Sequence, residues 1–233
     1  MAEKKTKAGR LKPLLMIVLV FGPALFLIFI ALNKCEHKFT TLPVYGKLTN
    51  YSFDDANGVV VDSESQQGKI TLFNTIQTSC PENCAIDLPK FNLMIYQDYR
   101  KNQRNLGHVK IVSIVTDQQG NPVSQDMIEE LKYTMKDIVE SYDPNIWKLV
   151  TGDPKQIYDI ESNGINLYTK TSDTAFAGKS FLETMLIVDK KNQLRLIRRG
   201  SEEGMIRDYK QHVALLQKQY DKEAAKREEN EEK

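Results

Sequence analysis

Two cysteines separated by three residues constrain this sequence more than any other feature. Cys80 and Cys84 follow the apolar, strand-like run 69–75 and precede residues 85–99, in which apolar side chains recur at roughly helical spacing. The unpaired N–H groups and the dipole at the start of a helix favour a thiolate over a thiol. Pro81 suits the first helical position, where a missing N–H costs nothing. We therefore expect both thiols in a first helical turn, close enough to form a disulfide or to bind one soft metal ion.

A second constraint is an apolar run near the N-terminus. Leu14 to Leu32 spans 19 residues without a charged side chain, although Gly22 and Pro23 interrupt it. This length suits a helix that spans the core of a bilayer. A cleaved secretory signal peptide is the alternative, but its apolar region is usually shorter, and no small-x-small cleavage pattern follows here. We therefore expect an uncleaved transmembrane anchor over residues 13–33.

The charges around this run predict its orientation. Basic side chains dominate residues 1–12, whereas both signs of charge follow the span. Because cytoplasmic flanks carry the excess of lysine and arginine, we expect the N-terminus in the cytoplasm and the rest of the chain outside it. The predicted location is the inner (cytoplasmic) membrane as a single-pass protein, with a connector over 34–41 and an extracytoplasmic or periplasmic domain. For Cys35, next to the span, both a lipid attachment site and an ordinary juxtamembrane thiol stay open.

The remaining length fits one domain over 42–220 and a charged tail over 221–233. The tail is expected to be a solvated helix end or disordered. The net charge of +1 gives no electrostatic reason to expect nucleic-acid binding.

Within the domain, the β-branched run 109–116 is typical of a buried parallel strand, and with the preceding strand and helix it forms a βαβ unit. Ser124 is expected to cap a helix to about residue 142, with Met127 and Ile138 on its apolar face. The other expected elements are a hairpin (50–62), a strand (147–152), a short helix (154–163), a second hairpin (184–188 and 193–198) and a last helix (202–220).

These elements predict an α/β fold of the thioredoxin-like type, a central mixed sheet flanked by helices, with one N-terminal transmembrane helix. The dithiol then lies at the carboxyl edge of a parallel strand, where α/β proteins usually place their sites. Asp117 follows the neighbouring strand at the same edge. It is either a secondary site residue or a residue that caps its own turn.

Short segments of the domain carry a resemblance to a known family. They are 43–46 (Pro-Val-Tyr-Gly), 57–58 (Asn-Gly), 78–84 (Thr-Ser-Cys-Pro-Glu-Asn-Cys), 113–117 (Ser-Ile-Val-Thr-Asp), 147–152 (Trp-Lys-Leu-Val-Thr-Gly), 186–189 (Leu-Ile-Val-Asp) and 199–200 (Arg-Gly). In this order, and behind a membrane anchor, they resemble the Sco/SenC family of membrane-anchored thioredoxin-like proteins. The resemblance covers nearly the whole predicted domain.

The resemblance implies that Cys80 and Cys84 bind copper, as Cu(I), together with a distant histidine. It also implies a partner, namely a subunit of a respiratory cytochrome c oxidase or its copper-site cysteines, which the protein metallates or reduces. In an ungapped match, Phe181 stands where the family has its histidine. No substitute is obvious in the sequence, because its three histidines are His37 in the connector, His108 before a strand and His212 in the last helix.

Two further functions stay open. Two thiolates can hold Cu(I) without an imidazole, but dithiol exchange needs no histidine and no metal. The protein is therefore either an oxidase assembly factor, a general extracytoplasmic thiol-disulfide oxidoreductase, or a degenerate binding protein without turnover. Whether it is an enzyme at all is left open by the sequence, as is a purely structural disulfide between the two cysteines.

Overall fold

The computed structural model describes residues 21–23, 26, 41–79, 86–162, 165, 166, 168 and 180–231. The chain divides into two compact units, Met1–Thr40 and Thr41–Lys233. The predicted span over 13–33 lies almost wholly outside the described residues, and so do Cys35, Cys80 and Cys84. Within the described part, no helix combines the length and the apolar character that a bilayer crossing requires.

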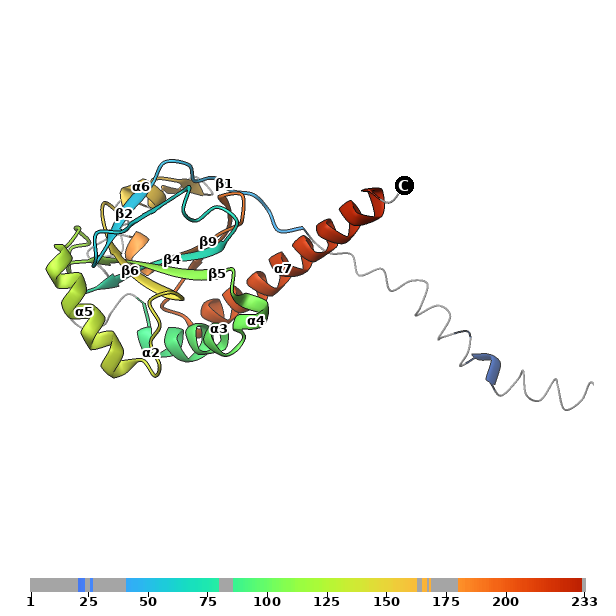
Figure 1. Cartoon of the computed structure of the whole chain (residues 1–233), viewed down its shortest axis with the longest axis horizontal. Coiled ribbons are helices and arrows are strands. Elements are labelled where there is room, and N and C mark those ends of the chain that lie inside the picture. Colours follow the sequence, from blue (N-terminus) through green and yellow to red (C-terminus); the bar gives the residue numbers. More distant parts are fainter. Residues whose placement is uncertain are drawn as a thin grey trace, which may run out of the picture. The chain divides into compact units, whose positions relative to one another are not determined.

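An eight-stranded mixed sheet forms the centre of the second unit (Figure 1). The neighbours β4, β5 and β6 run parallel, and the strands on either side of them run antiparallel. This arrangement confirms the predicted mixed α/β fold. The order across the sheet is β1 (Gly46–Lys47), β10 (Gln193–Arg199), β9 (Thr184–Val188), β4 (Ile70–Gln77), β5 (Val109–Thr116), β6 (Trp147–Thr151), β2 (Ser52–Asp55) and β3 (Val60–Asp62).

The two central strands are the best-defined part of the sheet. All eight residues of β4 are buried, and the strand pairs with β5 from Ile70↔Val109 to Gln77↔Thr116 without a break. A strand covered on both faces reads as a continuous apolar or β-branched run rather than as an alternation. The sequence therefore predicts β5 to the residue and places β4 correctly, two residues short of its carboxyl end.

The helical segment after β4 is less regular than its apolar spacing predicts. It consists of α2 (Leu88–Phe91), a π-helical segment η1 (Asn92–Tyr96), α3 (Gln97–Lys101) and α4 (Gln103–Leu106). Asp87 caps α2, since its carboxylate accepts a hydrogen bond from the N–H of Lys90 at 3.0 Å. Short π segments inside α-helices are uncommon and are often found near functional sites.

Helix α5 (Gln125–Ile138) has its predicted start but an earlier end. Ser124 is the N-cap, as expected, and Val139 leaves helical geometry with φ −108° and ψ 111°. Met127 and Ile138 are 40% and 57% exposed, so their expected place in the apolar face is wrong. They lie about 100° and 80° around the helix from the buried Ile128, outside the narrow stripe that packs on the sheet.

The C-terminal part differs from its sequence-based description at two points. The expected helix 154–163 is only one turn, α6 (Lys155–Tyr158), because Asp159 leaves helical geometry. The last helix α7 (Glu203–Glu231) continues through most of the charged tail, beyond the expected end at residue 220. The remaining elements are a small two-stranded sheet, β7 (Glu161–Ser162) with β8 (Ile165–Asn166), and the 3₁₀-helix η3 (Ser180–Glu183) before β9.

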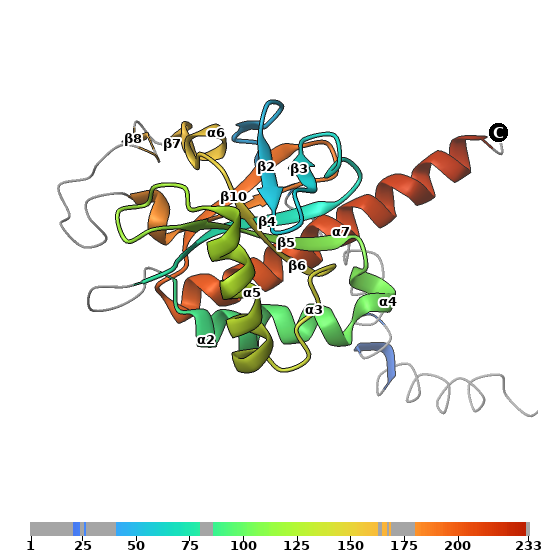
Figure 2. The ribbon, with the colours of Figure 1, turned by 60° about the vertical axis from the view of Figure 1, so that its left-hand side comes forward.

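The sheet separates two apolar clusters. One face carries the longer helices, and its core includes Phe91, Tyr96 and Trp147 together with Met135 of α5 and Leu216 of α7. The other face is covered by α6, η3 and the segment around β1 and β2. Figures 1 and 2 show α2, α3, α5 and α7 gathered on one side of the strands.

Candidate functional site

The carboxyl end of β4 is where the sequence places the dithiol. The described strand ends at Gln77, and the N–H of Thr78 extends the parallel pairing by donating to the carbonyl of Thr116 at 2.9 Å. The side-chain amide of Gln77 donates to the carbonyl of Gln118 at 3.1 Å. Two neighbouring strand ends are thus fixed to each other immediately before the cysteine segment.

The cysteine segment itself lies outside the described residues, so the predicted roles of Cys80 and Cys84 stay predictions. The chain is described again from Ile86, and the first helical residue there is Leu88. Burial raises the pKa of Asp87, but hydrogen bonds from Lys90 outweigh it and hold that pKa below its ordinary value. The cap of α2 is therefore a carboxylate at neutral pH, which favours the helix start.

Asp117 organises its own loop. Its Oδ1 accepts hydrogen bonds from the N–H groups of Gln119 and Asn121, each at 2.8 Å, and its Oδ2 accepts one from the side-chain amide of Asn121 at 2.8 Å. Aspartate side chains commonly stabilise turns in this way. These contacts favour the interpretation of Asp117 as a turn-capping residue over that of a metal ligand.

Phe181 lies at the same edge of the sheet, in η3 directly before β9. Because β9 runs antiparallel to β4, its start faces the carboxyl end of β4, and the hydroxyl of Thr75 donates to the carbonyl of Leu182 at 2.8 Å. The Phe181 ring is fully buried and packs against Tyr158 and Tyr168. At the position where the resemblance implies a histidine, this chain has a buried hydrocarbon ring.

The described histidines lie elsewhere. The carbonyl of His108 accepts from the N–H of Ile70 at the opposite edge of the sheet, at the start of β5. Burial, with a smaller contribution from Lys190, lowers the pKa of His108, so this ring is neutral near pH 7. His212 lies in α7, with its Nδ1 2.7 Å from the carbonyl oxygen of Asp208. His37 is outside the described residues.

Glu183 is a buried carboxylate at this edge that the sequence interpretation missed. Its side chain is 11% exposed and lies 3.3 Å from Nε of Arg199. Its backbone carbonyl accepts the N–H of Gly200 at 2.6 Å, and the carbonyl of Gly200 in turn accepts from Asp87 at 3.3 Å. Pairing of β9 with β10 brings Glu183 next to Arg199 and Gly200. The sequence analysis named Arg199 and Gly200 as part of the family resemblance, but it did not connect them with Glu183.

A buried polar chain beneath the site was also missed. Nε1 of Trp147 donates to Oγ of Ser113 at 2.7 Å, and that hydroxyl donates to Oδ1 of Asn74. Trp147 is fully buried in the core. Asn74 lies on β4, six residues before Cys80 in the sequence. The amide side chain of Asn74, within a strand that is buried along its whole length, was the available signal.

The described residues therefore provide a scaffold rather than a complete metal centre. No group of three or more histidine, cysteine, aspartate or glutamate side chains that could hold a metal ion occurs among them. What they fix is the pair of strand ends, the capped helix start and the aromatic ring at the position of the expected histidine.

Comparisons with known proteins show which proteins this chain resembles in sequence and in fold. A family model described as SCO1/SenC matches residues 45–214. BsSco, described as a member of the Sco family of cytochrome c oxidase assembly proteins with a disulfide switch, superposes with a TM-score of 0.50 at 15% identity, over 78% of this chain and 98% of that chain.

A candidate electron transport protein from Aquifex aeolicus VF5 superposes with a TM-score of 0.51 at 13% identity, over 75% of this chain and 96% of that chain. At these identities the two likenesses establish the fold alone. A search of the curated proteins returned no match.

Proposed function

Because this chain belongs to the SCO1/SenC family, we propose that it assists the maturation of the copper site of a respiratory cytochrome c oxidase through Cys80 and Cys84. The observation that carries the proposal is the junction at the end of β4. There the last residue of a fully buried parallel strand, tied to the neighbouring strand end, stands three residues before Cys80. Sites in α/β proteins gather at such carboxyl ends.

The dithiol can act by exchange. The Cys80 thiolate attacks one sulfur of a disulfide in the target, which breaks that S–S bond and leaves a mixed disulfide with one target thiolate released. The Cys84 thiolate then attacks the mixed disulfide, so the second target thiolate leaves and a Cys80–Cys84 disulfide remains. Two electrons pass from this protein to the target, and an external thiol must reduce the protein again.

Copper would enter as cargo on the same two sulfurs. Soft thiolates suit Cu(I), which accepts low coordination numbers, whereas Cu(II) favours a nitrogen ligand. The buried Phe181 ring offers no such nitrogen, and His108 lies at the opposite edge of the sheet. The donor set therefore fits Cu(I) on Cys80 and Cys84 and does not fit Cu(II).

Membrane attachment is part of the proposal. The apolar run 14–32 would hold the protein in the inner membrane with the N-terminus in the cytoplasm. The connector 34–41 would then leave the domain on the extracytoplasmic side. Extraction of membranes with alkaline carbonate tests this directly. The full chain should remain in the pellet, and a chain that begins at Thr41 should not.

A second function is favoured by the Phe181 observation. A protein that only exchanges disulfides has no need of a third ligand, so a metal-independent thiol-disulfide oxidoreductase is compatible with a phenyl ring there. A binding protein that keeps the fold but does not turn over is the third possibility.

The deciding experiment is an anaerobic titration of the reduced Thr41–Lys233 unit with Cu(I) against a competing chelator. The matched control is the double variant Cys80→Ser/Cys84→Ser. We expect binding of one Cu(I) per chain in the parent and none in the control. Equal results for both proteins would refute copper delivery, and reduction of a model disulfide by the same samples would then separate the oxidoreductase from the binding protein.

A further inference from the structure

Gly200 connects three elements near the carboxyl end of β4. Its N–H donates to the carbonyl of Glu183, the last residue of η3, at 2.6 Å. Its own carbonyl accepts a hydrogen bond from the N–H of Asp87, directly before α2, at 3.3 Å. Gly200 itself follows β10, whose last residue Arg199 pairs with Thr184 of β9. The start of α2 is thus held by the backbone at the junction of β9 and β10.

A side chain at position 200 would have no room. Gly200 is buried, and a Cβ there would overlap the terminal methyl group of Ile86 and come within 2.6 Å of the sulfur of Met185. Ile86 is 4% exposed and Met185 is fully buried, and both belong to the core on the face that carries the longer helices. The φ of Gly200 lies outside the left-handed region, so the backbone conformation does not require a glycine. What requires the glycine is the space that the side chain of Ile86 occupies.

Ile86 and Asp87 lie directly after the cysteine segment. Ile86 is the second residue after Cys84, and two residues of chain span at most about 7 Å. The carboxylate of Asp87 caps α2 by accepting the N–H of Lys90 at 3.0 Å, and Nζ of Lys90 lies 2.9 Å from its Oδ2. The contacts of Gly200 therefore hold both the packed side chain and the helix cap that follow Cys84.

We infer that Gly200 is a positioning residue for the dithiol, an inference that rests on the proposed function. The N–H of Thr78 fixes the chain before Cys80 to β5, and Gly200 fixes the chain after Cys84 to β9 and β10. A disulfide requires a Cβ–Cβ separation of about 3.5–4.5 Å, and a pair held away from this geometry is more easily reduced. Displacement of Ile86 by an added Cβ would therefore shift the equilibrium from the disulfide toward the dithiol.

The test equilibrates the full chain in detergent with glutathione. In the measured reaction, the Cys80–Cys84 dithiol and one glutathione disulfide give the protein disulfide and two glutathione thiols. After alkylation and trypsin digestion, the peptide 70–90 contains both cysteines and excludes Cys35, so mass spectrometry of this peptide gives the oxidised fraction. Gly200→Ala should lower the equilibrium constant about tenfold, which corresponds to about 30 mV in the reduction potential of a two-electron couple.

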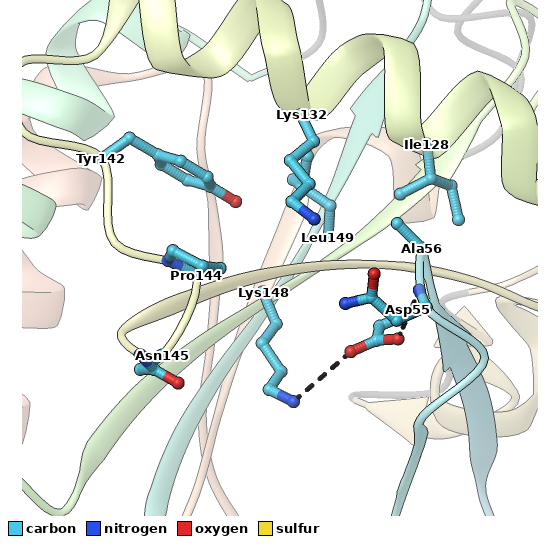
Figure 3. Close-up of a pocket in the computed structure, with 10 residues that line it drawn as sticks. Asp55, Ala56, Ile128, Lys132, Tyr142, Pro144, Asn145, Lys148 and Leu149 are labelled. Atoms are coloured by element: carbon cyan, nitrogen blue, oxygen red, sulfur yellow. Dashed lines mark hydrogen bonds and ion pairs between the residues drawn. The ribbon is translucent and has the colours of Figure 1, made fainter.

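The matched control is Gly152→Ala. Gly152 follows β6, the strand that pairs with β2 and from which Lys148 reaches toward Asp55 (Figure 3). A Cβ at Gly152 would come within 2.6 Å of the Phe53 ring, which belongs to the core on the other face of the sheet, and its φ of 149° adds backbone strain. This variant should be destabilised at least as much as Gly200→Ala. Its equilibrium constant should nevertheless stay within about twofold of the parent value, since it shares no contact with the start of α2.

A second substitution at Ile86 separates positioning from loss of stability. Ile86→Val removes the methyl group that a Cβ at position 200 would overlap, so Gly200→Ala/Ile86→Val should recover most of the parent equilibrium constant. If Gly200→Ala does not fold, Ile86→Ala releases the same contact without adding an atom. Its equilibrium constant should then fall in the same direction, and a parent-like value would overturn the inference.

Three further results would contradict the positioning role. They are an unchanged constant in Gly200→Ala, an equal shift in Gly152→Ala, and no recovery in the double variant. Failure of the proposed function would differ from all three, because the parent chain itself would form no Cys80–Cys84 disulfide at any glutathione ratio. That result would refute dithiol exchange and the inference together, whereas an unshifted Gly200→Ala beside a redox-active parent would refute the inference alone.

Discussion

The Phe181 ring stacks on the ring of Tyr168, with centroids 5.2 Å apart and planes inclined by 10°. Tyr158 packs on Phe181 from another direction, with centroids 5.6 Å apart. Aromatic pairs of this kind add about 0.5–1.5 kcal/mol beyond the burial of their surface. The position that the family resemblance assigns to a metal-binding histidine is thus part of the hydrophobic core in this chain.

Replacing Phe181 by histidine should lower the stability of the fold and increase the retention of Cu(II). A buried imidazole among aromatic rings loses packing and leaves ring nitrogens without partners, so we expect a loss of about 1–3 kcal/mol in the free energy of unfolding. If the proposed site lies beside it, Phe181→His should also increase retention of Cu(II), because a nitrogen ligand is added. Urea unfolding and equilibrium dialysis with Cu(II) measure the two effects.

The control for this variant is Phe91→His. Phe91 is also fully buried, but it packs on Trp147 with centroids 5.1 Å apart, on the other face of the sheet. It should be destabilised similarly without any gain in Cu(II). Equal copper retention by the two variants would show that position 181 is not next to the metal-binding sulfurs.

Single replacement of the cysteines should distinguish their roles in exchange. In Cys84→Ser the attacking sulfur is kept and the resolving sulfur is lost, so incubation with glutathione disulfide should accumulate a stable mixed disulfide on Cys80. In Cys80→Ser less of this adduct should form. Mass spectrometry of the intact protein under non-reducing conditions measures both, and the reverse pattern would assign the attacking role to Cys84.

The pair Arg195–Asp189 should dominate the stability of the region where the domain begins. Nη1 of Arg195 lies 2.8 Å from Oδ2 of Asp189, with the two side chains 5% and 1% exposed, and Nη2 donates to the carbonyl of Leu42 at 2.7 Å. Arg195→Met leaves a buried carboxylate without its positively charged partner, which should cost about 3–5 kcal/mol in urea unfolding.

The matched control for that pair is Arg198→Met. Arg198 pairs with Asp208 at 3.1 Å, but both side chains are about one-third exposed. Its loss should therefore cost at most about 1 kcal/mol, since exposed ion pairs contribute little. Comparable losses in Arg195→Met and Arg198→Met would contradict the assignment.

His108 should make the fold less stable in weak acid. Its pKa in the folded chain is lowered from 6.5, first by burial and then by Lys190. Below about pH 6.5 His108 binds a proton in the unfolded chain but stays neutral in the folded chain. The stability that is present above that pH is therefore lost as the pH falls from about 6.5 through the lowered pKa of the folded chain. In His108→Gln this part of the slope should disappear. Unfolding free energies measured at about pH 7.5 and 5.5 test it, and an unchanged slope would assign the loss to other groups.

Much of the fold was predictable because its signals are local. The strand 109–116 follows from a β-branched run, and the N-cap at Ser124 follows from its residue type and the helix after it. The early end of α5 and the exposure of Ile138 were not predictable in this way. They depend on how narrow a stripe of that helix the sheet can cover.

The candidate site also has features that the sequence determined and features that only the tertiary structure decided. The sequence by itself determined that two thiols follow an apolar, strand-like run, that an apolar run precedes the domain and that no histidine occurs between 109 and 211, since these are properties of residue order. Only the tertiary structure decided that Glu183 is buried beside Arg199, that Trp147, Ser113 and Asn74 form one polar chain, and that Phe181 stacks between tyrosines. Pairing of β9 with β10 and of β4, β5 and β6 brings the first two sets of residues together, and the packing of η3 on α6 brings the aromatic rings together. Local sequence patterns specify such long-range pairing only weakly.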